Sequence, residues 1–264
     1  NVFEQRFADW MTDDTLCLVS GMAGSRQGWR EAPYCPCPSG FQDIAQHLQW
    51  IEKDRIGIVP GLSTFNDTTP DVMRGEEIQI FGALSNLKIA NAQFVLPGTH
   101  SKWVMVKNNS VMHFHTFMTG ECFALLKQHS ILERTLSAPQ SDPSSADEGD
   151  ERLFDQGVAL AFTGASLLHT LFSVRTLALM DRLKPTQGLA YLSGLLIGEE
   201  LRAQAHLLKG PLVVVANPTL QRRYQRALAL RGFSCQTLGD DATWQGLQCL
   251  ASHLTRHTLG SISA

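Results

Sequence analysis

Strand patterns and helix patterns alternate along this chain, and the alternation limits the fold more than any other feature. Short apolar runs predict buried strands, and apolar residues at helical spacing predict the helices between them. The clearest strand patterns lie at Leu16–Ser20, Ile56–Val59, Phe94–Leu96 and Pro211–Val215, and the clearest helix patterns at Phe41–Trp50, Met73–Leu87, Leu189–Leu208, Leu220–Leu230 and Ala242–His257. Two more strand patterns flank Asn108-Asn109, as in a β-hairpin. The sequence therefore predicts an α/β fold with a mixed sheet and helices packed on its faces.

The composition argues against nucleic-acid and membrane partners. The chain has 264 residues, of which 44% are hydrophobic and 18% charged, so it can bury the core of one large or two modest domains. Its formal net charge is -3, and no cluster of Lys and Arg gives the footprint of a nucleic-acid or membrane surface. The longest apolar run, around Leu192–Ile197, is too short to span a bilayer, and the opening residues do not resemble a signal peptide. We therefore expect a cytoplasmic protein.

The cysteines and histidines give no convincing metal site. Cys35 and Cys37 lie close together in a Cys-Pro-Cys-Pro run, but no second pair or nearby histidine completes four ligands. Reduced loop thiols are the favoured interpretation. His113 and His115 would share one face of a strand, where a polar strand face is favoured over a metal pair. No metal-binding residue is predicted.

Three segments carry groups suited to chemistry, and the first is Ser20–Pro38, SGMAGSRQGWREAPYCPCP. A glycine-bearing loop leaves backbone N–H groups free to bind a ligand. Three side chains add donors suited to a carboxylate or polyol, namely Arg26, Gln27 and Arg30. The alternative is an ordinary loop with Trp29 and Tyr34 folded back onto the core.

The second segment is Asp71–Gly82, DVMRGEEIQIFG, which follows a polar loop over Asn66–Pro70. Glu76 and Glu77 open a helix directly after a glycine. One interpretation is a general base that accepts a proton from a sugar hydroxyl. The other is electrostatic capping, since a helix N-terminus favours carboxylates. Asp67 and Asp71 are weaker candidates for the base or for positioning a metal-bound water.

The third segment is Val95–Val104, VLPGTHSKWV, where a strand ends in a glycine and a threonine before the hairpin. Small residues and a hydroxyl there would let a phosphate approach the main chain, and Lys102 would neutralise phosphate charge. An ordinary turn is the alternative. Farther on, Thr119-Gly120-Glu121 has the sequence of a helix N-cap, with Thr119 as the capping residue.

Taken together, these segments resemble the 2-dehydro-3-deoxygalactonokinases. The stretches that carry the resemblance occur in order from about residue 20 to residue 201, namely SGMAGSRQGWREAPY, VMRGEE, VLPGTHSKWV, FMTGE and YLSGLLIGEEL. The resemblance implies an actin-like (ribonuclease H-like) fold of two α/β domains with a cleft between mixed sheets. It also implies transfer of the γ-phosphate of ATP, with Mg²⁺, to the 6-hydroxyl of 2-dehydro-3-deoxy-D-galactonate in galactonate breakdown.

The resemblance also assigns roles to individual residues. Glu76 would be the catalytic base, with Glu77 as the one-residue alternative. Gly98 and Thr99 match the second phosphate loop, which Lys102 follows. The sugar-acid side would include Ser25, Arg26, Trp29 and Glu31.

The sequence departs from the family pattern in two places. The family opens with a strand and a phosphate-binding loop, but Asp9-Trp10 here has a helical context and no glycine follows it, so we expect the first domain to be incomplete. At Val213–Leu220 the family places a glycine-rich turn near the adenosine, whereas this chain has Ala-Asn-Pro. Arg222, Arg223 and Tyr224 on the next helix are candidates for the purine side, a solvated helix face being the alternative.

The expected domains are residues 1–75, the remainder of an N-terminal actin-like domain, and residues 76–264, a C-terminal one with a mobile loop at 137–151. An active kinase is the favoured function. The alternatives are a non-catalytic sugar-acid binding relative and a truncated kinase without activity. The sequence leaves open which sugar-acid epimer is accepted and the oligomeric state, for which a homodimer is one option.

Overall fold

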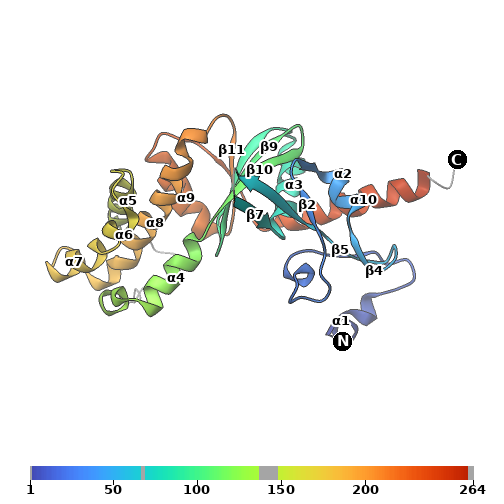
Figure 1. The fold of residues 1–264 in the computed structure, drawn as a ribbon, viewed down its shortest axis with the longest axis horizontal. Helices are drawn as coiled ribbons and strands as arrows, with labels where there is room; N and C mark the ends of the chain where they lie inside the picture. Colours follow the sequence, from blue (N-terminus) through green and yellow to red (C-terminus); the bar gives the residue numbers. More distant parts are fainter. Residues whose placement is uncertain (1, 67–68, 137–147, 261–264) are drawn as a thin grey trace. The chain divides into compact units, whose positions relative to one another are not determined.

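The computed structural model of the chain describes residues 2–66, 69–136 and 148–260 (Figure 1). The chain divides into two compact units. Unit 1 consists of Asn1–Ala92, Val104–His115 and Leu238–Ala264, and unit 2 of Gln93–Trp103 and Thr116–Thr237. These units are discontinuous, whereas the expected domains 1–75 and 76–264 are contiguous. The candidate Asp67 and residues 137–147 of the expected loop lie outside the described residues. The expected loop bound of 151 was wrong, because a helix begins at Glu148.

Helices and strands alternate along the chain. The α-helices are α1 Val2–Phe7, α2 Phe41–Gln46, α3 Glu76–Leu87, α4 Thr119–His129, α5 Glu148–Ala161, α6 Leu167–Thr170, α7 Ser173–Leu179, α8 Gly188–Gln204, α9 Pro218–Ala229 and α10 Asp241–Gly260. The strands are β1 Cys17–Val19, β2 Tyr34–Pro36, β3 Ser39–Gly40, β4 Gln49–Glu52, β5 Ile56–Ile58, β6 Gly61–Asn66, β7 Thr69–Met73, β8 Ala92–Leu96, β9 Ser101–Lys107, β10 Ser110–Phe117, β11 Leu212–Val215 and β12 Gln236–Leu238. The expected α/β class is confirmed.

Three sheets organise the chain, and all contain both parallel and antiparallel pairs. One three-stranded sheet has the order β1-β5-β4, in which β1 is parallel to β5 and β4 is antiparallel to β5. A second three-stranded sheet has the order β2-β6-β7, in which β2 is parallel to β6 and β7 is antiparallel to β6. The six-stranded sheet has the order β12-β11-β8-β9-β10-β3, with β11 parallel to β8 and β10 antiparallel to β3.

The expected hairpin connects β9 and β10. Its two turn residues, Asn108 and Asn109, both have positive φ, at 51° and 59°. Two consecutive left-handed residues form the turn that matches strand twist, and asparagine tolerates this conformation better than most residues. The hairpin therefore follows from the local sequence, and it fixes the register of the strand that carries Ser101 and Trp103.

Glycines allow the main helices to approach one another closely. In unit 1, a Cβ on Gly82 of α3 would lie 1.9 Å from the carbonyl oxygen of Ala242 in α10. In unit 2, a Cβ on Gly194 of α8 would lie 2.0 Å from the carbonyl oxygen of Phe154 in α5, and Gly157 and Gly198 make similar approaches. The helices thus pack backbone against backbone, where no larger side chain fits.

Two expectations from the sequence were wrong in detail. The helix expected over Phe41–Trp50 ends at Gln46, and Gln49 begins a strand, because pairing with β5 takes precedence over helical spacing. The polar loop expected over Asn66–Pro70 contains the end of β6 and the start of β7. Both errors lie at element boundaries, where local patterns are weakest.

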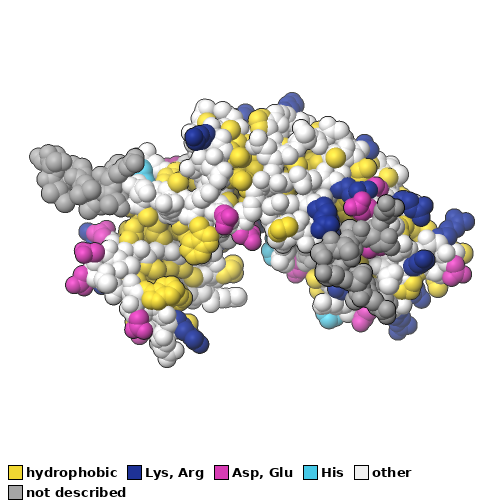
Figure 2. Space-filling view, turned by 180° about the vertical axis from the view of Figure 1, so that it is seen from behind, with side chains coloured by type: hydrophobic (Ala, Val, Ile, Leu, Met, Phe, Trp, Pro, Cys, Tyr) yellow, Lys and Arg dark blue, Asp and Glu magenta, His cyan; other side chains and the backbone are white. Residues whose placement is uncertain are grey.

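The N-terminal helix carries a row of aromatic side chains. Phe3 stacks on Trp29 with the ring centroids 4.9 Å apart, and Phe7 contacts both Phe3 and Trp10. Figure 2 shows hydrophobic side chains gathered at the lower left of that view, in the region of this helix. The helical context expected for Asp9-Trp10 is confirmed, since both lie in a 3-10 turn after α1.

Candidate functional site

The two glutamates that open α3 lie in contrasting environments. The carboxylate of Glu76 is half-buried and accepts a hydrogen bond from the backbone N–H of Arg74 at 3.0 Å. Glu77 is completely buried, and its Oε2 accepts from the backbone N–H of Gly75 at 2.6 Å. Burial raises the pKa of Glu77 to about 8, and the neighbouring charge of Glu76 adds to the rise. The accessible carboxylate of the pair is therefore Glu76.

Arg74 joins the start of α3 to the glycine-bearing loop after β1. Its Nη2 donates to the carbonyl oxygen of Ala32 at 2.8 Å, and its guanidinium lies 4.4 Å above the ring of Tyr34. A Cβ on Gly24 would meet Arg74 Nη1 at 2.8 Å, and one on Gly75 would lie 3.4 Å from the Cα atom of Gly21. Two of the three segments singled out in the sequence are therefore neighbours. Arg74 lies in the VMRGEE motif, but no local pattern in the sequence predicts a role for it.

The four residues expected on the sugar-acid side occupy this same loop region of unit 1. Arg26 and Glu31 are exposed and form an ion pair at 3.0 Å, and Ser25 is half-buried. Trp29 is half-buried and stacks on Phe3 of α1, a helix without buried residues, and not on the core. Their role in binding stays a prediction.

The expected phosphate loop lies in unit 2 between β8 and β9. Gly98 and Thr99 are exposed, and a Cβ on Gly98 would meet nothing within 4 Å. The start of α4 packs against this loop: the N–H of Glu121 donates to the carbonyl oxygen of Thr99 at 3.0 Å. The side chains of His100 and Glu121 form a further contact of 2.6 Å. The loop is thus open on one side and supported on the other.

Lys102 lies on a different face of the sheet from its neighbours in sequence. Its side chain is buried, and Nζ donates to Thr116 Oγ1 at 2.9 Å. Successive residues of a strand point to opposite faces, so Ser101 and Trp103 point away from Lys102. The phosphate role of Lys102 therefore stays a prediction, with the ammonium engaged on β10.

A buried carboxylate lies near the loop that contains Gly98 and Thr99. Glu200 of α8 accepts hydrogen bonds from Trp103 Nε1 at 2.6 Å, from the hydroxyl of Tyr224 at 2.9 Å and from the hydroxyl of Thr119. Ser101 Oγ lies 3.0 Å from the Tyr224 oxygen. The expectation that Thr119 caps α4 was wrong, because Thr119 is already helical and its hydroxyl donates to Glu200 instead. Glu200 was not predicted as a site residue from the sequence, although it lies in the YLSGLLIGEEL motif.

The segment that departs from the family pattern forms a regular helix start. Asn217 caps α9 by accepting from the N–H of Leu220 at 3.1 Å, and Pro218 takes the first helical position. Arg223, on the same helix, is half-buried and donates to Ser193 Oγ at 3.0 Å. Burial lowers the pKa of Arg223, and the charge of Arg222 adds to this.

Arg223 and Gly98 line the same small cavity. Its volume is about 80 Å³, and it is lined by Pro97, Gly98, Thr119, Gly120, Phe123, Ser193, Leu196, Ile197, Leu220, Arg223 and Tyr224. All these residues belong to unit 2. One cation, hydroxyl groups and the open glycine Gly98 therefore line a single hollow.

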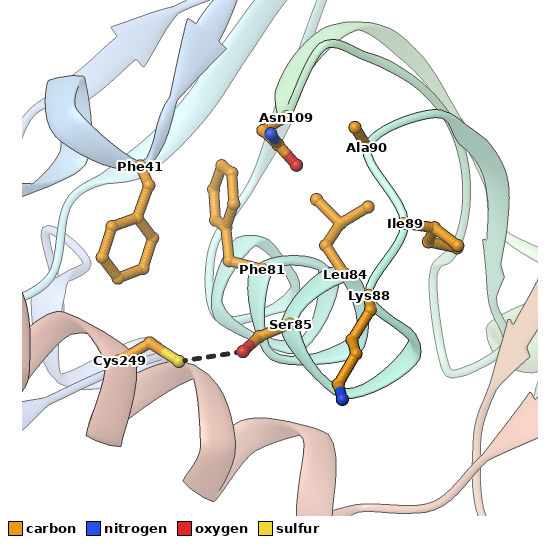
Figure 3. A pocket seen from close by; sticks show the side chains of 9 residues that line it. All are labelled: Phe41, Phe81, Leu84, Ser85, Lys88, Ile89, Ala90, Asn109 and Cys249. Carbon is orange, nitrogen blue, oxygen red and sulfur yellow. Dashed lines mark hydrogen bonds between the residues drawn. The ribbon is translucent and has the colours of Figure 1, made fainter.

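A larger pocket of about 370 Å³ lies in unit 1 and contains none of the expected site residues. It is lined by Phe41, Phe81, Leu84, Ser85, Lys88, Ile89, Ala90, Asn109 and Cys249 (Figure 3). The rings of Phe41 and Phe81 meet edge to face at 5.4 Å, and Cys249 Sγ lies 3.4 Å from Ser85 Oγ. This lining is mainly apolar and offers no acid–base pair.

Other groups considered in the sequence are accounted for by their surroundings. Burial raises the pKa of Cys35 to about 11 and of Cys37 to about 12. His113 and His115 share a strand face as expected, with ring centroids 5.7 Å apart. Within residues 2–66, 69–136 and 148–260, no three His, Cys, Asp or Glu side chains are placed to hold a metal ion together, and no helix combines the length and apolarity of a membrane span.

Comparison with known proteins identifies the relatives of this chain. The family model described as 2-keto-3-deoxy-galactonokinase matches residues 1–250. The chain is 34% identical to the 2-dehydro-3-deoxygalactonokinase of Escherichia coli (strain K12), over 92% of this chain and 80% of the relative. A Rhizobium meliloti (strain 1021) relative that carries the same enzyme name is 36% identical over 89% and 77% of the two chains.

A solved structure agrees with the sequence relatives. A Sinorhizobium meliloti protein assigned to the 2-dehydro-3-deoxygalactonokinases superposes with a TM-score of 0.85, at 33% identity, over 96% of this chain and 85% of that one. The fold and the sequence relatives define a carbohydrate kinase. The chain belongs to the 2-dehydro-3-deoxygalactonokinase family.

Proposed function

We propose that the chain transfers the γ-phosphate of ATP to the 6-hydroxyl of 2-dehydro-3-deoxy-D-galactonate, with Glu76 as the base. The observation that carries this proposal is the half-exposed carboxylate of Glu76, which the N–H of Arg74 holds at the start of α3. The names of the relatives support the sugar acid as the acceptor. Phosphoryl transfer needs positioning and charge stabilisation more than covalent help, so one placed base and a phosphate loop are sufficient machinery.

The contrast between the two glutamates favours Glu76 over Glu77. A base must reach the proton that it accepts, and Glu77 has no exposed surface. With a pKa of about 8, Glu77 is also largely protonated near neutral pH and cannot accept a proton there. Glu76 accepts the hydroxyl proton as the hydroxyl oxygen attacks phosphorus, and ADP leaves.

The sugar-acid side draws on the loop that Arg74 anchors to α3. Arg26 supplies an exposed guanidinium suited to the substrate carboxylate, and Glu31 holds it by an ion pair of 3.0 Å. Ser25 and Trp29 complete this side with a hydroxyl and an indole face. Because the loop lies next to the start of α3, these groups are close to Glu76.

The phosphate side draws on the open face of Gly98 and Thr99. Without a side chain on Gly98, a phosphate oxygen can reach the backbone N–H groups, and the Thr99 hydroxyl adds a donor. Lys102 supplies positive charge from the adjacent strand. Mg²⁺ enters as part of the ATP substrate, since this ion is usually bound by phosphates, water and only one or two carboxylates.

Arg223 is the best candidate on the nucleotide side. It lines the same cavity as Gly98, and the Ser193 hydroxyl orients its guanidinium. A half-buried guanidinium suits the ribose or a phosphate of ATP, because its charge is screened less than that of an exposed one. We expect Arg223→Met to raise the KM for ATP about tenfold, whereas Arg222→Met on the exposed face of α9 leaves it within about twofold.

The base assignment is tested by ADP release from ATP·Mg²⁺, with and without 2-dehydro-3-deoxygalactonate. We expect release to require the sugar acid. Glu76→Gln should lower kcat by roughly 10²- to 10⁴-fold, in the range of general base catalysis, with a smaller effect on either KM. Glu77→Gln is the matched control and should retain most of the activity. Near-native turnover of Glu76→Gln would remove Glu76 from the mechanism.

A further inference from the structure

Only two carboxylate side chains are buried among the described residues, those of Glu77 and Glu200. Glu77 has an oxygen, Oε1, without a hydrogen-bond partner, whereas both oxygens of Glu200 are bound. Burial raises the pKa of Glu200, and the surrounding donors oppose the rise. Trp103, Thr119 and Tyr224 all donate, and an ionised carboxylate only accepts. All three hydrogen bonds are therefore satisfied when Glu200 is ionised. A buried charge is costly, which makes its placement informative.

Two of the three donors to Glu200 come from segments that border the proposed phosphate loop, and the third, Tyr224, comes from α9. Trp103 lies in β9, the strand that begins just after the loop, and its indole N–H donates at 2.6 Å. Ser101, the first residue of β9, reaches the same carboxylate through the hydroxyl of Tyr224. Thr119 is the first residue of α4 and donates directly. One side chain of α8 therefore connects β9, α4 and α9.

The residues next to Thr119 contact the loop itself. The N–H of Glu121 donates to the carbonyl oxygen of Thr99 at 3.0 Å. A Cβ on Gly120 would lie 2.3 Å from the carbonyl oxygen of Gly98 and 2.9 Å from the Cα atom of Thr99. Any movement of the first turn of α4 is therefore transmitted to the loop backbone.

We propose that Glu200 is a positioning residue that holds the loop at Gly98 and Thr99 in its phosphate-binding conformation, through Thr119 and α4 on one side and through β9 on the other. The proposal rests on the phosphate role of this loop. Glu200 does not touch the phosphate, and its effect is preorganisation: the donors of the loop are fixed before ATP arrives.

The first test measures order in the loop without any substrate. Hydrogen–deuterium exchange is followed in the peptides that span residues 97–103 and 118–122 of the full chain. Glu200→Gln places an amide N–H₂ where one of the three donors now binds, so we expect faster exchange in both peptides. The matched control is Glu199→Gln on the same helix, because Glu199 pairs with Arg202 and not with the network. The control should leave both peptides unchanged.

The second test is kinetic and distinguishes positioning from general destabilisation. In Glu200→Gln we expect kcat/KM for ATP to fall about tenfold or more, while the KM for the sugar acid stays within about twofold. Glu199→Gln should leave both values unchanged. A merely structural residue would lower the amount of active enzyme and leave the KM values of the folded fraction as they are.

A second set of variants keeps the proposal testable if Glu200→Gln does not fold. Thr119→Val removes one donor at nearly constant shape, and Thr119→Ser restores the hydroxyl. We expect Thr119→Val to show the faster exchange and the lower kcat/KM for ATP, and Thr119→Ser to recover most of both. A wild-type chain without kinase activity would refute the proposed function, and the exchange measurement would still decide on positioning. Unchanged exchange, or changed exchange with unchanged kcat/KM for ATP, would overturn the role of Glu200.

Discussion

A Cβ atom on Gly120 would lie 2.3 Å from the carbonyl oxygen of Gly98. The first turn of α4 and the proposed phosphate loop are thus in direct backbone contact, and only glycine allows this approach at position 120. Close contact of this kind makes the loop conformation depend on the exact position of a helix, which is more rigid than a loop.

Gly120→Ala should therefore displace the loop. The added methyl group meets backbone atoms, which cannot rotate away as a flexible side chain would. We expect kcat/KM for ATP to fall by roughly 10- to 100-fold, since small misplacements of catalytic groups have effects of this size. The helix propensity of alanine offsets part of the strain, so the loss of stability should be below about 2 kcal/mol. Steady-state kinetics and urea unfolding measure the two effects, and unaltered kinetics would show that the loop tolerates the shift.

Gly98→Ala should weaken ATP binding while leaving the stability of the fold nearly unchanged. A Cβ on Gly98 meets no atom within 4 Å, and its φ is not positive, so the free energy of unfolding should change by less than about 1 kcal/mol. The methyl group would nevertheless occupy the space through which a phosphate reaches the loop amides. We expect at least about a tenfold rise in the Kd for ATP by calorimetry. Gly239→Ala, where a Cβ also meets nothing, is the matched control, and equal affinities of the two variants would contradict the loop assignment.

The buried Glu77 should make stability decrease with rising pH. Its pKa rises from 4.5 to about 8 on folding, so between these values the folded chain holds a proton that the unfolded chain has released. The contribution to stability is complete below pH 4.5 and is lost as the pH rises through about 8. The total change is on the order of a few kcal/mol.

Glu77→Gln tests this dependence, because the amide mimics the protonated carboxyl group without titrating. Urea unfolding at about pH 6 and about pH 9 should show a smaller decrease for Glu77→Gln than for the wild type. Glu133→Gln, at an exposed position, should keep the wild-type decrease. An equal decrease in the free energy of unfolding for wild type and Glu77→Gln would mean that Glu77 is ionised in the folded chain at both pH values.

Gly194→Ala should destabilise unit 2 at the contact between α5 and α8. The new Cβ would lie 2.0 Å from the carbonyl oxygen of Phe154, so α5 and α8 would have to separate. We expect the free energy of unfolding to fall by roughly 1–3 kcal/mol, the usual range for overpacking. A shift of the urea midpoint at constant slope measures it, and an unchanged midpoint would show that the helices are not in backbone contact.

Local patterns were sufficient to predict most elements of the fold. The hairpin at Asn108-Asn109 and the buried strand Leu212–Val215 follow from turn chemistry and apolar runs, and the structure confirms both. The strand β4 could not be found in this way, because Gln49–Glu52 pairs with β5 only once the chain has folded. Its sequence continues the helical spacing of the preceding residues.

The candidate site depends on the order of the motifs. Glu76, Gly98 and Thr99 are assigned their roles because each lies in a short stretch that resembles the family, and these roles stay predictions. No local pattern indicates that Thr119 and Glu200, which are 81 residues apart, share a hydrogen bond. From the sequence alone, a capping hydrogen bond within α4 is an equally good role for the Thr119 hydroxyl. Only the folded structure shows that this hydroxyl donates to Glu200 instead.

The five tryptophans of the chain all fall within the described ranges, and Trp103 is the buried one among them. Trp103 is the third residue of β9, the strand that follows the proposed phosphate loop. Its indole N–H donates to the carboxylate of Glu200. Indole emission depends on the charge and polarity around the ring. The molecule therefore carries an intrinsic fluorophore at the point where its loop is anchored, and the light from that single buried ring should report nucleotide occupancy without any added label.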